Sequence, residues 1–426
     1  MRLPARVCVV ALLTVSPALL RCQVAPDDTS RLRGWRGDID SLVSVARRIH
    51  ASPLRPAYSP AFENAARRLK SRVYDLPDSR VMVEIQRMVA ILGDGHSLVY
   101  PMPARGTSFA MLPVDVYLFA DGLFVVGGLA SAKDLIGFRI LRIGSVPVDE
   151  LLTRMTPYVS RDNAMGVKAF ASLYLIMPEF LAAWGATDDS QSAVLTMRDT
   201  TGAMKVVRLA AGPPRRIAKR VQAPAFASTP LPVYLRQPDR PIWMTRLENA
   251  DLLYVQFNRV TDSPSMTLAE FARLLADTLR LVGPRGLIVD VRHNVGGNNE
   301  LIDPLVQTIA SYAAADSRRV IYVITSRSTF SAAQNFINRV ERLTPTAIFA
   351  GEPSMSSPNF TGEDNPTRLP YSGLVISISN RYWQDSRPDD HRAWIEPHLR
   401  ISLRSTDWLH NCDPVLEAVL RDFGAR

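Results

Sequence analysis

The chain has 426 residues, of which 47% are hydrophobic and 21% are charged, and it contains three cysteines. This length is enough for two or three domains with separate cores, and three cysteines cannot supply a disulfide framework. The net charge of +9 is carried mostly by arginines scattered along the chain. Because nucleic-acid binding requires a clustered basic patch, we expect no nucleic-acid partner.

The first 25 residues are predicted to be a signal peptide (1–25). Arg2 and Arg6 form a basic start, and residues 7–20 form an apolar stretch too short for an ordinary spanning helix. Cleavage is expected between residues 22 and 26, and the arginine before Cys22 makes that cysteine a poor lipidation site. No later window is apolar enough to span a membrane, so we predict a periplasmic or secreted bacterial protein. A retained N-terminal anchor is the alternative.

Residues 35–101 are predicted to form an N-terminal helical domain. Helical spacing of apolar residues occurs at 40–46 and 62–69, with a proline-rich turn between them. A third helix, at 81–92, leads into a loop that contains His96. The block is either a packing cap or the support of a functional loop.

Residues 102–214 are predicted to form a β-rich middle domain. Residues 121–126 indicate one arm of a hairpin, and residues 135–148 resemble the core of a PDZ domain, a module that accepts peptide tails by strand addition. The Gly-Leu-Gly-Phe loop of that module is absent, and a helical insert is predicted at 163–181. The alternative is a spacer domain without a ligand.

After a linker at 211–240, the block 245–426 is predicted to alternate strands and helices. A buried strand at 286–292 is followed by a turn that contains Gly296 and Gly297, and glycines allow the backbone to approach a ligand closely. A second apolar strand, at 320–324, precedes Ser331 at the start of a helix. The free amides at a helix start suit an oxyanion. The alternative is that Ser331 only caps the helix.

Together these two segments resemble the C-terminal-processing (tail-specific) peptidases, in the branch of the tricorn core and the repeats of interphotoreceptor retinoid-binding protein. The resemblance covers roughly residues 35–420. It implies a crotonase-like α/β catalytic domain, with Ser331 as nucleophile and the amides of Gly297 (or Gly296) and Ala332 as the oxyanion hole. Residues 351–354 (Gly-Glu-Pro-Ser) and 394–398 also resemble family segments. Gln334 stands where many members have glutamate.

The same resemblance implies that His96 is the catalytic base. One branch of the family uses a lysine after the serine, but this chain has no lysine after Lys219. The other branch uses a histidine in an Asp-Gly-His-Ser/Thr signature, which residues 94–97 match. A neutral imidazole is the usual base for a serine hydroxyl at neutral pH.

The acidic residue that orients His96 is expected before the closing strand. The family pattern favours Asp390, with Asp389, Glu352 and Glu363 as alternatives. Adjacent aspartates beside arginines are also typical of a solvated, charge-paired loop.

The sequence therefore predicts an exported serine endopeptidase that hydrolyses peptide bonds of protein or peptide substrates through a Ser-His acyl-enzyme. No metal-binding or dinucleotide-binding fingerprint is present, so no cofactor and no metal are expected. The alternative is a non-catalytic peptide- or ligand-binding protein on the same scaffold. An acyl-CoA enzyme of the crotonase type would lack the serine turn. The natural substrate and the oligomeric state stay open.

Overall fold

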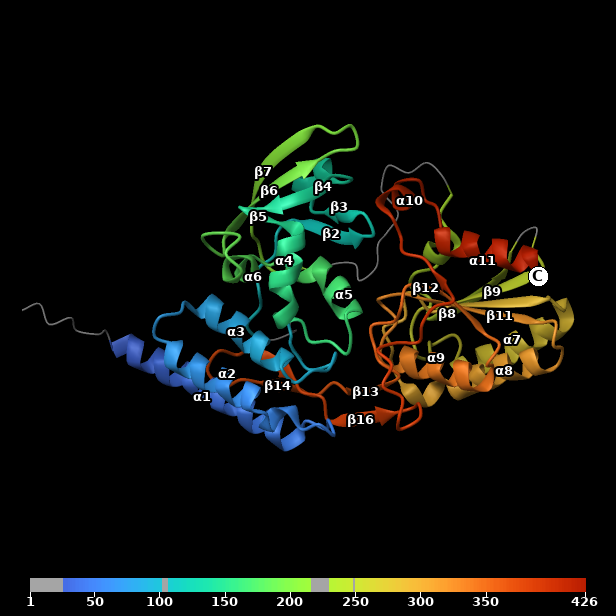
Figure 1. The fold of residues 1–426 in the computed structure, drawn as a ribbon, viewed down its shortest axis with the longest axis horizontal. Coiled ribbons are helices and arrows are strands. Elements are labelled where there is room, and N and C mark those ends of the chain that lie inside the picture. The colour runs from blue at the N-terminus through green and yellow to red at the C-terminus, as the bar shows by residue number, and fades with distance from the viewer. Residues whose placement is uncertain (1–25, 102–105, 216–229, 248–249) are drawn as a thin grey trace, which may run out of the picture.

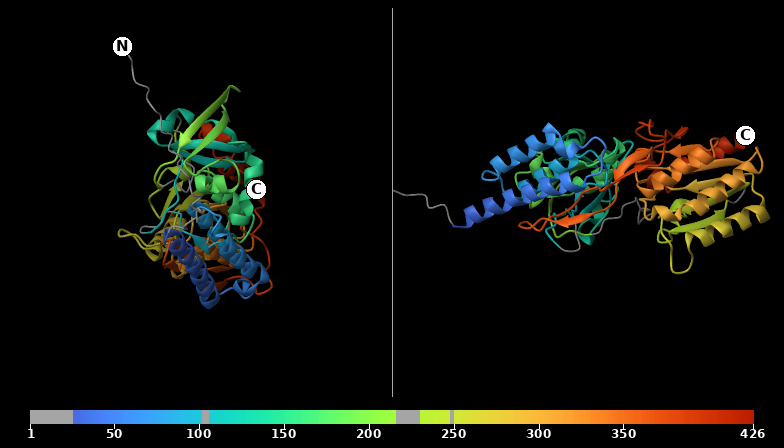
Figure 2. Two further views of the ribbon diagram at one scale, coloured as in Figure 1. Left: turned by 90° about the vertical axis from the view of Figure 1, so that its left-hand side faces the viewer. Right: turned by 90° about the horizontal axis from the view of Figure 1, so that it is seen from below.

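The structure, a computed structural model, describes residues 26–101, 106–215, 230–247 and 250–426, so the predicted signal peptide and Cys22 lie outside it. The chain has a mixed α/β fold with several sheets. In Figure 1, N-terminal helices and a β-rich middle part lie beside an α/β part formed by the second half of the chain. Figure 2 shows that these parts give the molecule an elongated shape. Within the described ranges, no helix is long and apolar enough to cross a membrane.

Three helices form the N-terminal part, and each of them overlaps a helix expected from the sequence. The second helix starts where the Ser59 hydroxyl accepts a hydrogen bond from the Phe62 amide, which satisfies a free helix-start donor. The third helix buries one apolar face and ends at Ala90, six positions before His96. The helices are α1 (Pro26–Ile49), α2 (Pro60–Arg72) and α3 (Asp78–Ala90).

The middle part is an antiparallel sheet in the order β2-β3-β4-β6-β7, with β5 paired to β4. The predicted hairpin is confirmed as β2 and β3, and the predicted helical insert contains α5 and α6. The strands are β2 (Val114–Phe119), β3 (Gly122–Gly128), β4 (Arg139–Ile143), β5 (Val146–Pro147), β6 (Ser192–Arg198) and β7 (Met204–Ala210). The helices are α4 (Val148–Met155), α5 (Met165–Tyr174) and α6 (Pro178–Ala183).

The third part is built on a six-stranded sheet in the order β17-β12-β11-β10-β9-β8, parallel except for β8. Side chains alternate along β9, so that Val255 packs under the helices on one face and Tyr254 packs against α11 on the other. Figure 1 shows α7, α8 and α9 together on the first face. The strands are β8 (Ile242–Arg246), β9 (Leu252–Phe257), β10 (Gly286–Asp290), β11 (Val320–Thr325), β12 (Ile348–Gly351) and β17 (Leu399–Arg400). The helices are α7 (Leu268–Val282), α8 (Asp303–Ala314), α9 (Ala332–Leu343), α10 (Ser405–Leu409) and α11 (Pro414–Ala425).

Between β12 and β17 the chain leaves this sheet and returns to the N-terminal part. There β15 pairs with β1, the strand that follows His96, with Leu98 opposite Ser377. In Figure 1, β13, β14 and β16 run from the α/β part to the N-terminal helices. The returning segment also packs Leu374 and Ile376 into a core that the N-terminal helices share with the middle sheet. Segments nearly 280 residues apart therefore hold the His96 loop against the α/β part. The strands are β1 (Leu98–Val99), β13 (Asn359–Gly362), β14 (Pro366–Arg368), β15 (Val375–Ser377) and β16 (Arg381–Gln384).

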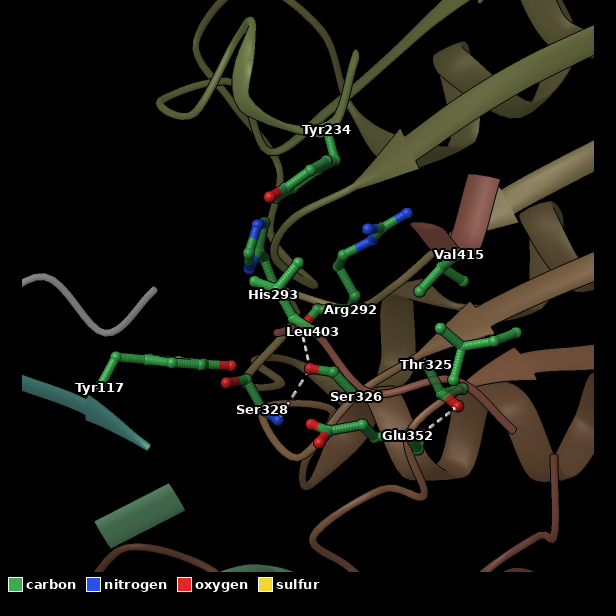
Figure 3. A pocket seen from close by; sticks show the side chains of 11 residues that line it. Tyr117, Tyr234, Arg292, His293, Thr325, Ser326, Ser328, Glu352, Leu403 and Val415 are labelled. Carbon is green, nitrogen blue, oxygen red and sulfur yellow. Dashed lines mark hydrogen bonds between the residues drawn. The ribbon is translucent and has the colours of Figure 1, made fainter. Parts of the chain in front are cut away.

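A buried ion pair connects the middle sheet to the α/β part. Two nitrogens of Arg327 donate to the two carboxylate oxygens of Glu352 at 2.7 and 2.5 Å, and a third donates to the Leu118 carbonyl on β2 at 2.6 Å. Beside this pair lies a cavity of about 50 Å³, lined by Tyr117 on the middle sheet and by Tyr234 and other residues of the α/β part (Figure 3). The joint between the middle sheet and the α/β part therefore combines an almost completely buried ion pair with tyrosine side chains.

We expect Arg327→Leu to lower the free energy of unfolding by about 3–5 kcal/mol, because it leaves the Glu352 carboxylate buried without its partner. The double variant Arg327→Leu/Glu352→Leu should recover at least half of this loss. Urea unfolding followed by tryptophan fluorescence measures both. Arg280→Leu is the matched control: its pair with Asp277 is exposed and should contribute less than about 1 kcal/mol. Equal effects of Arg327→Leu and Arg280→Leu would contradict the prediction.

Candidate active site

Ser331 lies in a strained turn between β11 and α9. Its backbone has φ 59° and ψ −126°, a conformation that costs a non-glycine residue about 1–3 kcal/mol. The side chain makes no capping hydrogen bond to α9, so the alternative that Ser331 only caps the helix is not what the structure has. The strain instead turns the hydroxyl away from the helix, and the residue is half-buried.

The hydroxyl of Ser331 meets the imidazole of His96. The distance from Ser331 Oγ to His96 Nε2 is 2.9 Å, within hydrogen-bond range. The His96 loop is held by Asp94, whose Oδ1 accepts from the amides of His96 at 2.9 Å and Ser97 at 2.6 Å. The other oxygen, Oδ2, pairs with His50 Nε2 at 2.9 Å. Thus the aspartate of the Asp-Gly-His-Ser sequence builds the loop and does not touch the imidazole.

Two aromatic rings flank the imidazole of His96, which is half-buried. The ring of Phe330 lies 4.2 Å from it and that of Phe360 lies 5.5 Å from it, centroid to centroid. Burial lowers the pKa of His96 to about 4, although the negative charges of Asp94 and Asp364 oppose the shift. The imidazole is therefore neutral at physiological pH, as an acceptor of the Ser331 proton must be.

The second nitrogen of His96, Nδ1, is buried and has no hydrogen-bond partner among the described residues. The main-chain carbonyl of Thr361 favours the protonated imidazole, but it lies outside hydrogen-bond geometry with Nδ1. If Nε2 accepts from Ser331, Nδ1 carries the ring proton. Stacking and the loop, rather than a carboxylate, set the orientation of the ring.

The glycine turn after β10 packs directly on Ser331. A Cβ on Gly296, whose φ is 100°, would lie 2.7 Å from Ser331 Cβ and 3.0 Å from the Ala332 nitrogen. The Gly296 amide donates to Asn294 Oδ1 at 3.0 Å. Within the described ranges, the amides of Gly297 and Ala332 donate to no acceptor. Of the two glycines that the sequence left open, Gly297 therefore has the free amide, and it is exposed.

Asp390 is not brought to His96. Its carboxylate accepts from the Arg392 guanidinium at 2.8 and 2.9 Å and from the Ser386 hydroxyl at 2.6 Å. The hydrogen bonds from Arg392 hold the pKa of Asp390 well below its ordinary value. These contacts fit the charge-paired loop that is the alternative for this segment, because an arginine two residues away binds both oxygens.

Within the described ranges, the alternative acids also make no hydrogen bond to His96. Glu352 is paired with Arg327, Asp389 is exposed beside Arg387, and Glu363 is exposed. Gln334 is buried and ties α9 to the following loop, since its Oε1 accepts from the Ser354 hydroxyl at 2.6 Å. In the part of the chain that the structure describes, no group of three histidine, cysteine or acidic residues could hold a metal ion.

Several residues of the site were missed in the sequence. Phe330 and Phe360 carry no motif, although Phe330 directly precedes Ser331. Ser356, whose hydroxyl oxygen accepts from the Ser331 amide at 3.2 Å, lies two residues beyond the Gly-Glu-Pro-Ser match. Asp162 contacts the His96 loop from the middle part, through a hydrogen bond of 2.7 Å from the Gly95 amide. Only Ser356 had a sequence signal, its distance from that motif.

No family model and no curated protein matches this chain. Among solved structures, mature CPAF complexed with lactacystin matches with a TM-score of 0.62 and 13% identity, over 92% of this chain and 98% of that one. Mature CPAF alone matches with a TM-score of 0.58 and 14% identity, over 90% and 95%. The photosystem II D1 C-terminal processing protease matches with a TM-score of 0.41 and 13% identity, over 92% and 97%.

The likeness to mature CPAF, at TM-scores of 0.62 and 0.58, shows the fold of this chain. The predicted family resemblance is confirmed at the level of that fold.

We expect the His96 imidazole to titrate with a midpoint at about pH 4, because burial disfavours its charged form. Between about pH 4 and 6.5 the unfolded chain binds a proton that the folded chain excludes, so this residue makes the free energy of unfolding rise with pH there. NMR of the histidine ring protons measures the midpoint, and His96→Gln assigns the resonance. A midpoint near 6.5 would contradict the geometry described for the ring.

Proposed function

We propose that this protein is a serine peptidase of the C-terminal-processing type. The observation that carries the proposal is the 2.9 Å contact between Ser331 Oγ and His96 Nε2, in a chain with the fold of that family. A neutral imidazole in hydrogen-bond contact with a hydroxyl is the arrangement that activates a serine nucleophile.

The reaction begins when His96 Nε2 accepts the Ser331 proton while Oγ attacks the carbonyl carbon of a peptide bond. The carbonyl oxygen becomes negative and receives hydrogen bonds from the free amides of Gly297 and Ala332, at the positive end of α9. His96 then gives its proton to the leaving nitrogen, which breaks the C–N bond and leaves an acyl-enzyme. Water hydrolyses the ester by the same steps, and Ser331 is restored.

Asp390 takes no direct part in this scheme. Its contacts fix the loop 386–392, and Asn359, at the start of β13, donates to the Arg387 carbonyl in that loop at 2.7 Å. The next residue, Phe360, stacks on His96. Asp390 therefore acts on the base through Asn359 and Phe360, as a support of the loop.

The wider proposal is an exported enzyme that acts on peptides or proteins in the periplasm or outside the cell. The signal-like residues 1–25 support export. The nearly parallel sheet β9–β12 with helices on both faces supports a crotonase-like catalytic part, and the antiparallel middle sheet supports a PDZ-like part that binds peptide.

The second candidate is a non-catalytic binding protein on the same scaffold. One observation favours it: His96 Nδ1 has no acidic partner among the described residues, so no carboxylate would stabilise an imidazolium. The two candidates differ in the reactivity of Ser331, since only an activated hydroxyl reacts with an electrophile.

We expect a fluorophosphonate probe to label Ser331, with the modified peptide identified by mass spectrometry. Labelling should be lost in Ser331→Ala and strongly slowed in His96→Ala, while Ser328→Ala, three residues away, serves as the control. Wild-type protein that stays unlabelled and cleaves no unfolded protein substrate would favour the binding protein.

For peptide cleavage we expect Ser331→Ala and His96→Ala each to lower kcat/KM by about 10⁴-fold or more, because nucleophile and base act as a unit. Asp390→Asn should lower it by less than about tenfold and reduce stability, because the isosteric amide loses the charge-assisted bonds from Arg392. Steady-state kinetics and thermal unfolding measure the two effects. A loss in Asp390→Asn as large as in His96→Ala would instead make Asp390 the orienting acid.

A further inference from the structure

Asp162 brings a carboxylate from the middle part to the loop that carries the base. It lies between a 3₁₀ turn (Thr156–Tyr158) and α5, and its Oδ1 accepts from the Gly95 amide at 2.7 Å. A Cβ on Gly95 would lie 3.3 Å from this oxygen and 2.8 Å from the Phe330 ring. The contact is therefore close, and it acts on the residue directly before His96.

The second oxygen of Asp162 faces the loop that supports the nucleophile. Although the residue is half-buried overall, Oδ2 has no contact with solvent and no hydrogen bond within the described ranges. The Ser356 hydroxyl and the Ser357 amide lie near enough to favour its ionised form. Because the Ser356 oxygen accepts from the Ser331 amide, its own proton is free for Asp162.

These contacts form a ring around the candidate site. Hydrogen bonds join the Ser331 amide to Ser356, the Gly95 amide to Asp162, and His96 Nε2 to Ser331 Oγ. The Ser356 hydroxyl closes the ring by lying near Asp162 Oδ2, without a hydrogen bond between them. Asp162 is the one member of the ring that comes from the middle part. Each neighbour can donate to it, so the ring suits an acceptor-only carboxylate.

The position of Asp162 does not depend on its own carboxylate. The next residue, Asn163, donates through Nδ2 to the carbonyls of Ser354 at 3.1 Å and Ala393 at 2.7 Å. Its Oδ1 accepts from the Met165 amide and so starts α5. This loop is thus attached to the α/β part without Asp162, and we expect variants at 162 to fold.

We propose that Asp162 is a positioning residue for the Ser331–His96 pair, whose ionised carboxylate keeps the base loop and the nucleophile turn in register. The inference rests on the proposed peptidase function. It adds that a residue of the middle part controls the position of the Ser331–His96 pair. Ionised acceptors make hydrogen bonds roughly twice as strong as neutral ones, so protonation of Asp162 relaxes the ring.

The surroundings of Asp162 set the pH of this change. Burial and the negative charge of Asp94 raise the pKa of Asp162 to about 7. Arg161, its neighbour, is turned away, with its guanidinium on the carbonyls of Thr156 and Val159. His96, beyond Gly95, is neutral at this pH. Asp162 therefore changes charge near neutral pH while His96 does not.

The sign of the linked effects follows from this pKa. Above about pH 7 the carboxylate is ionised and holds the ring, so the His96 loop and the Ser331 turn keep their relative position. Between pH 3.8 and about 7 the folded chain binds a proton that the unfolded chain has lost, so the free energy of unfolding falls as pH rises. The folded protein with ionised Asp162, which holds the ring, is thus less stable than the folded protein with neutral Asp162.

The kinetic test compares wild type, Asp162→Asn and the exposed control Asp149→Asn on a flexible peptide from pH 5 to 9. In the wild type we expect kcat to rise about tenfold through pH 7, with KM unchanged. Asp162→Asn should keep the low-pH value at every pH, and Asp149→Asn should follow the wild type. A step at pH 7 that persists in Asp162→Asn would overturn the proposal, as would an effect on KM alone.

The second test needs no catalysis. The His96 ring resonances of the wild type should show a small inflection near pH 7, besides their own titration at lower pH. The inflection should be absent in Asp162→Asn and in Ser356→Ala, which removes the bridging hydroxyl, and present in Asp149→Asn. If the inflection follows this pattern but no variant cleaves peptide, the positioning role stands and the peptidase function fails. If peptide is cleaved but the inflection is missing, or unchanged in both ring variants, the positioning role fails alone.

Discussion

The contact between His96 and Ser331 joins residues 235 positions apart in the chain, and the rest of the structure is arranged to make it possible. His96 belongs to the N-terminal helices, whereas Ser331 belongs to the α/β sheet. The segment from β13 to β16 connects them, since it leaves that sheet and pairs with the strand that follows His96. A core shared by the N-terminal helices, the middle sheet and this segment keeps the pairing rigid.

Backbone strain and close packing fix the other side of the contact. The positive φ of Ser331 directs its hydroxyl away from α9, and Gly296 lies so close that any side chain would collide with the turn. A strained backbone conformation of this kind persists only where several surrounding contacts hold it in place. Here those surroundings are the Ser356 hydroxyl, the glycine turn and the His96 ring, which are also the groups that chemistry at Ser331 would use.

Local patterns in the sequence predicted some of the elements and named Ser331 and His96, which the structure brings into contact. Apolar spacing predicted α2, α3 and β11, and short motifs selected Ser331 and His96. What could not be predicted depends on contacts across the fold. Arg392 occupies the Asp390 carboxylate, an outcome that the local sequence left undecided. The contact of Asp162 with Gly95 spans 67 positions and follows no spacing rule. The low pKa of His96 comes from its burial, and the rings of Phe330 and Phe360, which stack on it, lie together only after folding.

Two tasks, staying neutral as a base and changing charge near neutral pH, belong to different groups here. A catalytic triad assigns them to one connected set of groups. Burial lowers the pKa of His96 to about 4, so His96 is neutral over the physiological range and its charge does not change with pH there. The group that we infer to change charge near neutrality is Asp162. Its Oδ1 accepts from the Gly95 amide beside His96, and its Oδ2 lies near the Ser356 hydroxyl that accepts from the Ser331 amide. Since Asp162 belongs to the middle part, a ligand or a motion that displaces that part would change the register of base and nucleophile without touching either. The ring therefore gives the middle part a physical route to the site, which a peptide-binding role of that part would require.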